Sequence, residues 1–174
     1  MPNPTPNLLF RQPVSKIRTL DILSGCYIGH FYEMTEECVC GCPLVFADDP
    51  CHVKLAVPGQ CNEEGTIVGL SNTIVYDPQN PNAYKGAKKQ RDESTMLGNI
   101  IKTVCGDGWV KTSNYQGELR PGDLLYPAIK TLSKEQTGED LPVAQVETEG
   151  NNGDIPVRIR LLLGRVKPWI RKDG

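Results

Sequence analysis

The residues whose types could do chemistry gather in one segment of the chain, which contains Cys38, Cys40, Cys42, Cys51 and His52. Thiolates and imidazoles are zinc ligands, and they must lie about 2.0–2.3 Å from the metal in a tetrahedron. Residues two apart in an extended strand are separated by about 6.6–6.8 Å, so the Cys-x-Cys-x-Cys spacing fits zinc only if the chain turns sharply. Gly41 could provide that turn, although the usual Cys-x-x-Cys knuckle is absent.

The sequence leaves three interpretations of these cysteines open: a metal site, a disulfide, and buried thiols that pack as small apolar side chains. It favours the third, because buried cysteine commonly behaves as a small hydrophobe. The chain has seven cysteines, two of them (Cys26 and Cys61) flanking the cluster, and the odd number leaves at least one unpaired in a monomer. We predict neither a metal ligand nor a cofactor here.

Nucleophilic catalysis has little support in the sequence. The chain contains two histidines, His30 and His52. Cys51 and His52 are neighbours, and neighbours in a strand point to opposite faces, which disfavours a Cys–His pair. We therefore predict no catalytic residues and no enzymatic activity.

The glycine-flanked acidic residues are better explained by backbone geometry. The segment Gly106-Asp107-Gly108 lacks the length and the lysine of a phosphate-binding loop. Asp107, Asp123 and Asp154 each lie beside a glycine, where a short carboxylate can accept a hydrogen bond from its own backbone. We predict that all three form turns.

Charge and hydropathy exclude several kinds of partner. Nineteen Lys and Arg residues face twenty-one Asp and Glu residues, which gives no basic excess for binding nucleic acid. No apolar run approaches the roughly 20 residues of a membrane-spanning helix. The N-terminal residues lack the basic and apolar regions of a secretory signal, so we expect synthesis and assembly in a cytoplasm, where thiols stay reduced.

The scaffold is predicted to be all-β. Short strand-like segments alternate with turns that contain Gly, Pro, Asn and Asp, and helix-favouring periodicity is absent. This spacing of turns is typical of an antiparallel β-barrel or β-sandwich. We assign residues 1–20 to an extended N-terminal arm and residues 21–174 to a β-domain with a long loop at 77–98.

The arm and the loop are the first two predicted contact regions. Prolines favour an extended arm, yet it carries Leu8, Leu9 and Phe10, which either pack on the chain's own core or contact a neighbouring subunit. The loop contains a cationic run, with one helical turn expected near 91–97. We name as candidate partner-binding residues of this loop Lys88, Lys89 and Arg91.

The closing strand has the clearest register in the chain. Its apolar residues alternate with arginines, so Arg158 and Arg160 should face outward and are the remaining candidate partner-binding residues. We expect the core to receive Ile155, Val157, Ile159 and Leu161. Asn152-Gly153 predicts a type I′ turn that joins this strand to the segment Val143–Glu147.

The order of elements in the C-terminal half points to a known family. It runs from Gly108-Trp109-Val110 through Gly117–Leu125 and Pro142–Glu147 to the arginine-bearing strand Ile155–Leu163. With this order, residues 104–165 resemble the small cement or decoration proteins that coat the capsids of tailed bacteriophages. The cysteine-rich segment lies outside this pattern.

The resemblance implies a non-enzymatic structural protein on the outer surface of a phage head. It would bind the major capsid protein, stabilise contacts between capsomers, and form a homo-oligomer, as a dimer or trimer. It would be assembled in the host cytoplasm and reside on the capsid surface of the virion. The alternative hypothesis is a small zinc- or thiol-dependent protein centred on Cys38–His52.

Overall fold

A computed structural model describes residues 18–29, 32–80 and 94–169. These residues form β-strands and turns and contain no α-helix, which confirms the all-β prediction. Accordingly, no described helix is long and apolar enough to cross a membrane. The arm residues Leu8, Leu9 and Phe10, the loop residues Lys88, Lys89 and Arg91, and His30 lie outside the described residues.

Within the described residues, twelve strands form one mixed sheet, with β1 branching from β9 and the others in the order β10-β13-β12-β14-β16-β9-β5-β3-β4-β2-β8. Most of the pairs are antiparallel, but β10–β13 and β2–β4 are parallel. The two ends of this order do not pair in the described structure, so the sheet does not close into a barrel and is compatible with a sandwich. The strands of the first half are β1 (Leu20–Ile28), β2 (Tyr32–Met34), β3 (Pro43–Phe46), β4 (His52–Leu55), β5 (Gly69–Ser71), β6 (Ile74–Tyr76), β7 (Ser94–Met96) and β8 (Ile100–Ile101).

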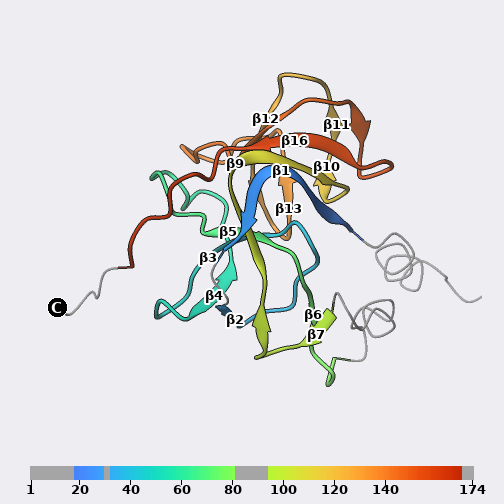
Figure 1. The fold of residues 1–174 in the computed structure, drawn as a ribbon. Coiled ribbons are helices and arrows are strands. Elements are labelled where there is room, and N and C mark those ends of the chain that lie inside the picture. Colours follow the sequence, from blue (N-terminus) through green and yellow to red (C-terminus); the bar gives the residue numbers. More distant parts are fainter. Residues whose placement is uncertain (1–17, 30–31, 81–93, 170–174) are drawn as a thin grey trace, which may run out of the picture.

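The second half supplies β9 (Thr103–Thr112), β10 (Tyr115–Gln116), β11 (Glu118–Leu119), β12 (Leu124–Ala128), β13 (Thr131–Ser133), β14 (Ala144–Val146), β15 (Gly150–Asn151) and β16 (Val157–Leu161). Two further pairs, β11–β15 and β6–β7, stand apart from the large sheet. The long strand β9 is the centre of the fold, because it pairs with β1, β16 and β5 (Figure 1).

Two apolar cores lie on the sheet. The larger one contains Val110 of β9, Leu125 of β12 and Ile159 of β16. The smaller one contains Met34 of β2, Leu44 of β3 and Val53 of β4. Residues of both cores are fully buried, as expected for β-rich segments that alternate across a sheet.

The closing strand has the predicted register over most of its length. Val157, Ile159 and Leu161 are fully buried, whereas Arg158 and Arg160 are exposed. Ile155 was predicted to face the core, and this was wrong: it is 52% exposed, because β16 begins only at Val157 and Ile155 belongs to the preceding turn.

The predicted Asn-Gly turn is present, although it is not the whole connection. Asn152 and Gly153 have φ angles of 50° and 72°, and Asp154 donates its backbone N–H to the Asn151 carbonyl at 3.0 Å, as in a type I′ turn. The pairing of β14 with β16 closes earlier, at the bond from Glu147 N–H to the Arg158 carbonyl. The turn therefore forms the tip of a longer connection, of which β15 pairs with β11.

Three local predictions need correction. The helical turn expected near 91–97 is wrong over its described part, where Ser94–Met96 forms β7, parallel to β6. Asp107 does not form a turn, because it lies within β9 at a bulge opposite β1. The last residues of the predicted arm are attached to the fold, since Leu20 begins β1 and Thr19 donates its N–H to Ser113 Oγ at 2.9 Å.

Candidate partner-binding surface

The first strand, β1, is the least buried long element of the structure. It pairs with β9 along one edge, and no described residue pairs with its other edge. Only its first residue, Leu20, is buried. Four large apolar side chains are exposed on it: Ile22 (37%), Leu23 (47%), Tyr27 (55%) and Ile28 (42%).

Glycines allow β1 to lie so close to β9. A Cβ atom at Gly108 would lie 2.2 Å from the carbonyl carbon of Gly25, so a larger residue would push the two backbones apart. Gly25 itself has a φ of 74°, a conformation that other residues rarely adopt, and it lies at a bulge in the pairing between Ser24 and Cys26. The segment 106–108 is therefore part of a close contact between strands.

One arginine of β16, Arg158, lines a shallow groove of about 360 Å³ beside this strand. The groove is lined by Leu23, Ser24, Trp109, Glu147 and Arg158. The Trp109 Nε1–H donates to Glu147 Oε1 at 2.6 Å, and Arg158 Nε lies 3.5 Å from Glu147 Oε2. Glu147 Oε2 is buried and accepts no hydrogen bond from the described residues, so its charge is balanced by the ion pair with Arg158.

The second arginine extends the same surface. The guanidinium of Arg160 lies 5.6 Å from the centroid of the Trp109 ring, a cation–π contact. Arg160 and Trp109 are also partners in the pairing of β16 with β9, and Ser24 is the partner of Trp109 on β1. We call the face formed by Leu23, Trp109, Glu147, Arg158 and Arg160 the Trp109 groove.

Cys38 and Cys42 interact with each other, but the other cysteines of the segment do not join them. Gly41, with a φ of 88°, provides the sharp turn expected from the sequence. That turn directs Cys38 and Cys42 into the smaller core and Cys40 into the larger one. Cys51 is exposed. Within 18–29, 32–80 and 94–169, no three Cys, His, Asp or Glu side chains are arranged to hold a metal ion.

Buried polar contacts stabilise the cysteine segment. Cys42 Sγ donates to the Lys130 carbonyl at 3.1 Å, and burial raises the pKa of this thiol well above its ordinary value. The buried Asn114 donates from Nδ2 to the carbonyls of Cys40 (2.9 Å) and Lys130 (3.0 Å). Burial of Cys38, Cys40 and Cys42 agrees with the prediction that these thiols pack as apolar side chains.

His52 is held between two carboxylates. Its Nδ1 lies 2.8 Å from Asp49 Oδ1, and its Nε2 lies 2.7 Å from Glu33 Oε2. The hydrogen bond with Asp49 raises the pKa of His52 above its ordinary value, and the same bond lowers the pKa of Asp49. Because Glu33 and His52 are partners in the β2–β4 pair, the ring joins these two strands.

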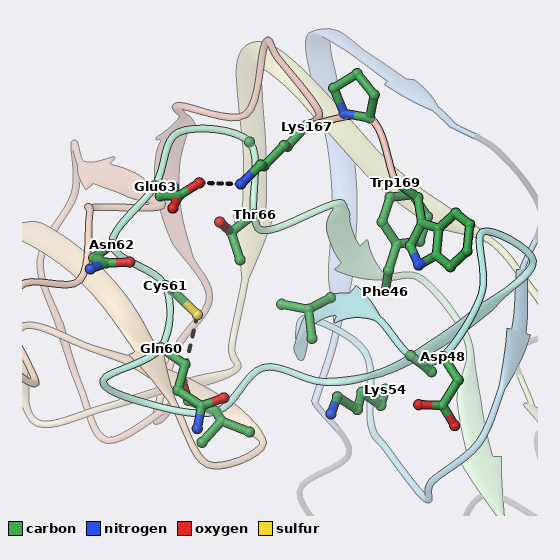
Figure 2. A pocket seen from close by; sticks show the side chains of 15 residues that line it. Phe46, Asp48, Lys54, Gln60, Cys61, Asn62, Glu63, Thr66, Lys167 and Trp169 are labelled. Carbon is green, nitrogen blue, oxygen red and sulfur yellow. Dashed lines mark hydrogen bonds and ion pairs between the residues drawn. The ribbon is translucent and has the colours of Figure 1, made fainter. Parts of the chain in front are cut away.

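A cavity of about 480 Å³ lies between β3, β4, the loop 57–66 and the C-terminal segment (Figure 2). Its charged residues include Glu63 and Lys167, which form an ion pair with each other. Its one thiol, Cys61, donates to the Val57 carbonyl, and burial raises the pKa of Cys61 to about 11. A thiol with this pKa is protonated at neutral pH and is a poor nucleophile.

Sequence reasoning missed three residues that organise the surface and its support. Trp109 and Glu147 were treated only as parts of strands, because their contact depends on the strand order β14-β16-β9. Asp140 is fully buried and accepts the backbone N–H groups of Gly59 (2.7 Å) and Cys61 (2.8 Å). No local pattern distinguishes Asp140 from other loop acids.

The chain matches no protein-family model and no curated protein. Its function must therefore be argued from the surface itself.

Proposed function

We propose that this chain is a structural protein that binds the outer surface of a phage head and stabilises contacts between capsomers, as a cement or decoration protein. The observation that carries the proposal is β1, a nine-residue strand that exposes four large apolar side chains beside the Trp109 groove. Exposed apolar residues gathered in this way mark a surface for binding a macromolecule rather than a site for chemistry.

The composition of the surface fits a protein partner. Tryptophan, tyrosine and arginine are the residues that most often dominate protein–protein binding energy, and here Trp109, Tyr27 and the two arginines of β16 lie on β1 and the strands beside it. Arg158 and Arg160 are exposed on the outer face of β16 and suit carboxylates of a partner.

The capsid as partner is supported by the resemblance of residues 104–165. The strands that carry this resemblance, from β9 to β16, form the scaffold on which β1 and the groove lie. On this proposal the partner is the major capsid protein, the protein is a homo-oligomer, and its location is the virion surface. The nearly balanced charge agrees with a protein surface as partner rather than nucleic acid.

Sedimentation of the purified protein with phage heads tests the proposal. Heads from the source phage that lack this protein are mixed with the full chain and centrifuged through a density gradient. The wild-type chain should move with the heads. Leu23→Lys should reduce the bound fraction at least tenfold, because it places a cation in the apolar part of the groove next to Arg158.

Ile129→Lys is the matched control. Ile129 is 75% exposed in the connection between β12 and β13, outside the groove, so this variant should bind like the wild type. Equal loss in both variants, or a wild-type chain that stays at the top of the gradient, would contradict the proposal. About one zinc per purified chain by elemental analysis would favour the zinc-dependent hypothesis instead.

A further inference from the structure

We infer that the open edge of β1 is a docking site for residues 7–12 of a second copy of this chain, which add to it as an extra strand. The inference deepens the proposed function and rests on it for the role of β1 as a contact surface. It assigns the backbone edge of β1 to a neighbouring copy and leaves the Trp109 groove for the capsid.

The edge has the properties of a strand that accepts another strand. Exposed edges are usually protected by Lys, by Pro, by short length or by β-bulges. β1 is nine residues long and contains neither Lys, Arg nor Pro, and its one charge is Asp21. Two bulges interrupt its pairing with β9, but Leu20–Ile22 and Cys26–Ile28 keep regular register on either side of them.

The exposed side chains favour an added strand over a sheet packed on one face. Ile22 and Leu23 are consecutive, as are Tyr27 and Ile28, and consecutive residues in a strand point to opposite faces. A sheet packed on β1 would cover only one member of each pair. A strand added to the edge brings its own side chains beside both faces, as in peptide recognition by β-augmentation.

The N-terminal segment contains one stretch suited to this role. Asn7–Gln12 is free of proline and is bounded by Pro6 and Pro13, which cannot donate to a ladder. Six residues are a common strand length. Leu8, Leu9 and Phe10 are also consecutive apolar residues, so this stretch presents apolar side chains to both faces, as β1 does.

The chain path favours a second copy over the chain's own arm. Thr19 donates to Ser113 Oγ, and Arg18 Nη1 donates to the Ser113 carbonyl at 2.9 Å, so the chain continues past the start of β1 along the line of β9. Figure 1 shows this blue end of the chain on the far side of the molecule from the red C-terminal segment. Residues 13–17 contain no Gly, Asn or Asp, the residues of two-residue hairpin turns, so a tight hairpin back onto β1 is disfavoured.

Photo-cross-linking of the full-length free protein tests the inference. The chain carries p-benzoyl-L-phenylalanine in place of Phe10, and equal amounts of ¹⁵N-labelled and unlabelled protein are unfolded, refolded together and irradiated. We expect cross-links from position 10 to residues 20–28, in which heavy and light peptides are joined in the mixed ratio expected for two chains. Cross-links to β1 that join light peptides only to light and heavy peptides only to heavy would overturn it. Cross-links formed mainly to another surface would overturn it as well.

Sedimentation equilibrium of full-length variants provides the second measurement. The wild type should associate, and both Ile28→Lys and the triple change of Leu8, Leu9 and Phe10 to Ser should weaken self-association at least tenfold. Ile129→Lys should not. A wild type that stays monomeric up to about 100 µM overturns the inference; this range is set by the micromolar affinities of standard-sized interfaces. No phage head is present, so failure here leaves head binding untouched, whereas failure of head binding leaves the cross-links in place.

Discussion

The strands β1 and β16 flank the same strand, β9, and differ in almost every other respect. Val110 of β9 is the partner of Ile22 on β1 and of Ile159 on β16, yet Ile22 is 37% exposed and Ile159 is fully buried. β16 is covered by the larger core, whereas β1 lies at the margin of the sheet. The comparison shows that pairing with a central strand does not bury side chains; a packed layer does.

The hydrophobic patterns of β1 and β16 also differ. Val157–Leu161 alternates apolar residues with arginines, the pattern of a strand with one wet face. Leu20–Ile28 has apolar neighbours that point to both faces, the pattern of a strand buried on both sides, but the structure exposes it. The proposed function assigns this exposed strand, with its apolar sequence, to contact with a partner.

The largest expected effect is on the buried member of the matched pair. Ile159→Ala should lower the free energy of unfolding by about 2–5 kcal/mol, because it opens a cavity in a packed core. Ile22→Ala should cost less than about 1 kcal/mol, since its side chain remains in contact with water. Denaturant unfolding of dilute protein measures both values. Equal costs would mean that β1 is as well packed as β16.

The next largest effect is expected from a substitution that weakens the pairing of β1 with β9 but not the pairing of β16 with β9. Gly108→Ala should destabilise the protein by about 1–3 kcal/mol, because its methyl group would overlap the backbone at Gly25. Hydrogen exchange followed by mass spectrometry should show faster exchange in β1 and unchanged protection in β16. Loss of protection in both strands would show that β1 supports the whole sheet.

A smaller effect is expected from the arginines on the wet face of β16. The side chain of Arg158 is 53% exposed beside Glu147, and such ion pairs contribute about 0–1 kcal/mol. The contact of Arg160 with Trp109 contributes about 0.5–1 kcal/mol. Arg158→Ala and Arg160→Ala should therefore change the melting temperature by a few degrees at most (about 2–4 °C per kcal/mol at this size), yet reduce binding to heads. Unfolding of either variant would place the arginines in the core.

The smallest expected effect is the dependence of stability on pH. It should not change the exchange rates of β1 relative to those of β16. The pKa of His52 is raised above 6.5, so its contribution to stability is complete below pH 6.5 and is lost as pH rises through the raised value. The pKa of Asp49 is lowered below 3.8, so its contribution is present above pH 3.8 and is lost as pH falls through the lowered value. The pair thus stabilises the fold most between these limits.

Thermal unfolding from pH 5 to pH 9 measures this dependence, with His52→Gln as the control. The variant should lose the decline in stability that the wild type shows above pH 6.5. His30 is retained in both proteins, so a decline that persists in the variant would assign it to another group. Hydrogen exchange of β1 relative to β16 should not change over this range, because neither strand contains a histidine.

The sequence predicted the fold best where one face of a strand is buried and the other is exposed to solvent. The alternation predicted four core residues, of which Val157, Ile159 and Leu161 are buried in β16. It failed at Ile155, because alternation does not mark where pairing starts. The exposure of β1 could not be predicted, because hydropathy alone does not tell a strand inside a sheet from one at its margin. The bulge at Asp107 arises from the close approach of Gly25 and Gly108, which are far apart in sequence.

The candidate surface was found only in part. Arg158 and Arg160 were placed correctly on the outer face, but their contacts with Glu147 and Trp109 depend on the order β14-β16-β9, which local patterns do not specify. The cysteines attracted attention through their spacing, yet the turn at Gly41 sends Cys40 into a different core from Cys38 and Cys42. The spacing alone suggested a single cluster, whereas the side chains enter two different cores.

Hydrogen exchange of the full chain, free and bound to phage heads, tests the central claim most directly. The account predicts that, relative to free chain dilute enough to be monomeric, binding slows exchange at the amides of Leu20–Ile28 and of the adjacent groove, while the amides of β2, β3 and β4 exchange as in the free protein. Unchanged exchange in β1, with new protection over β2–β4, would contradict the assignment of β1 as the surface through which this protein acts.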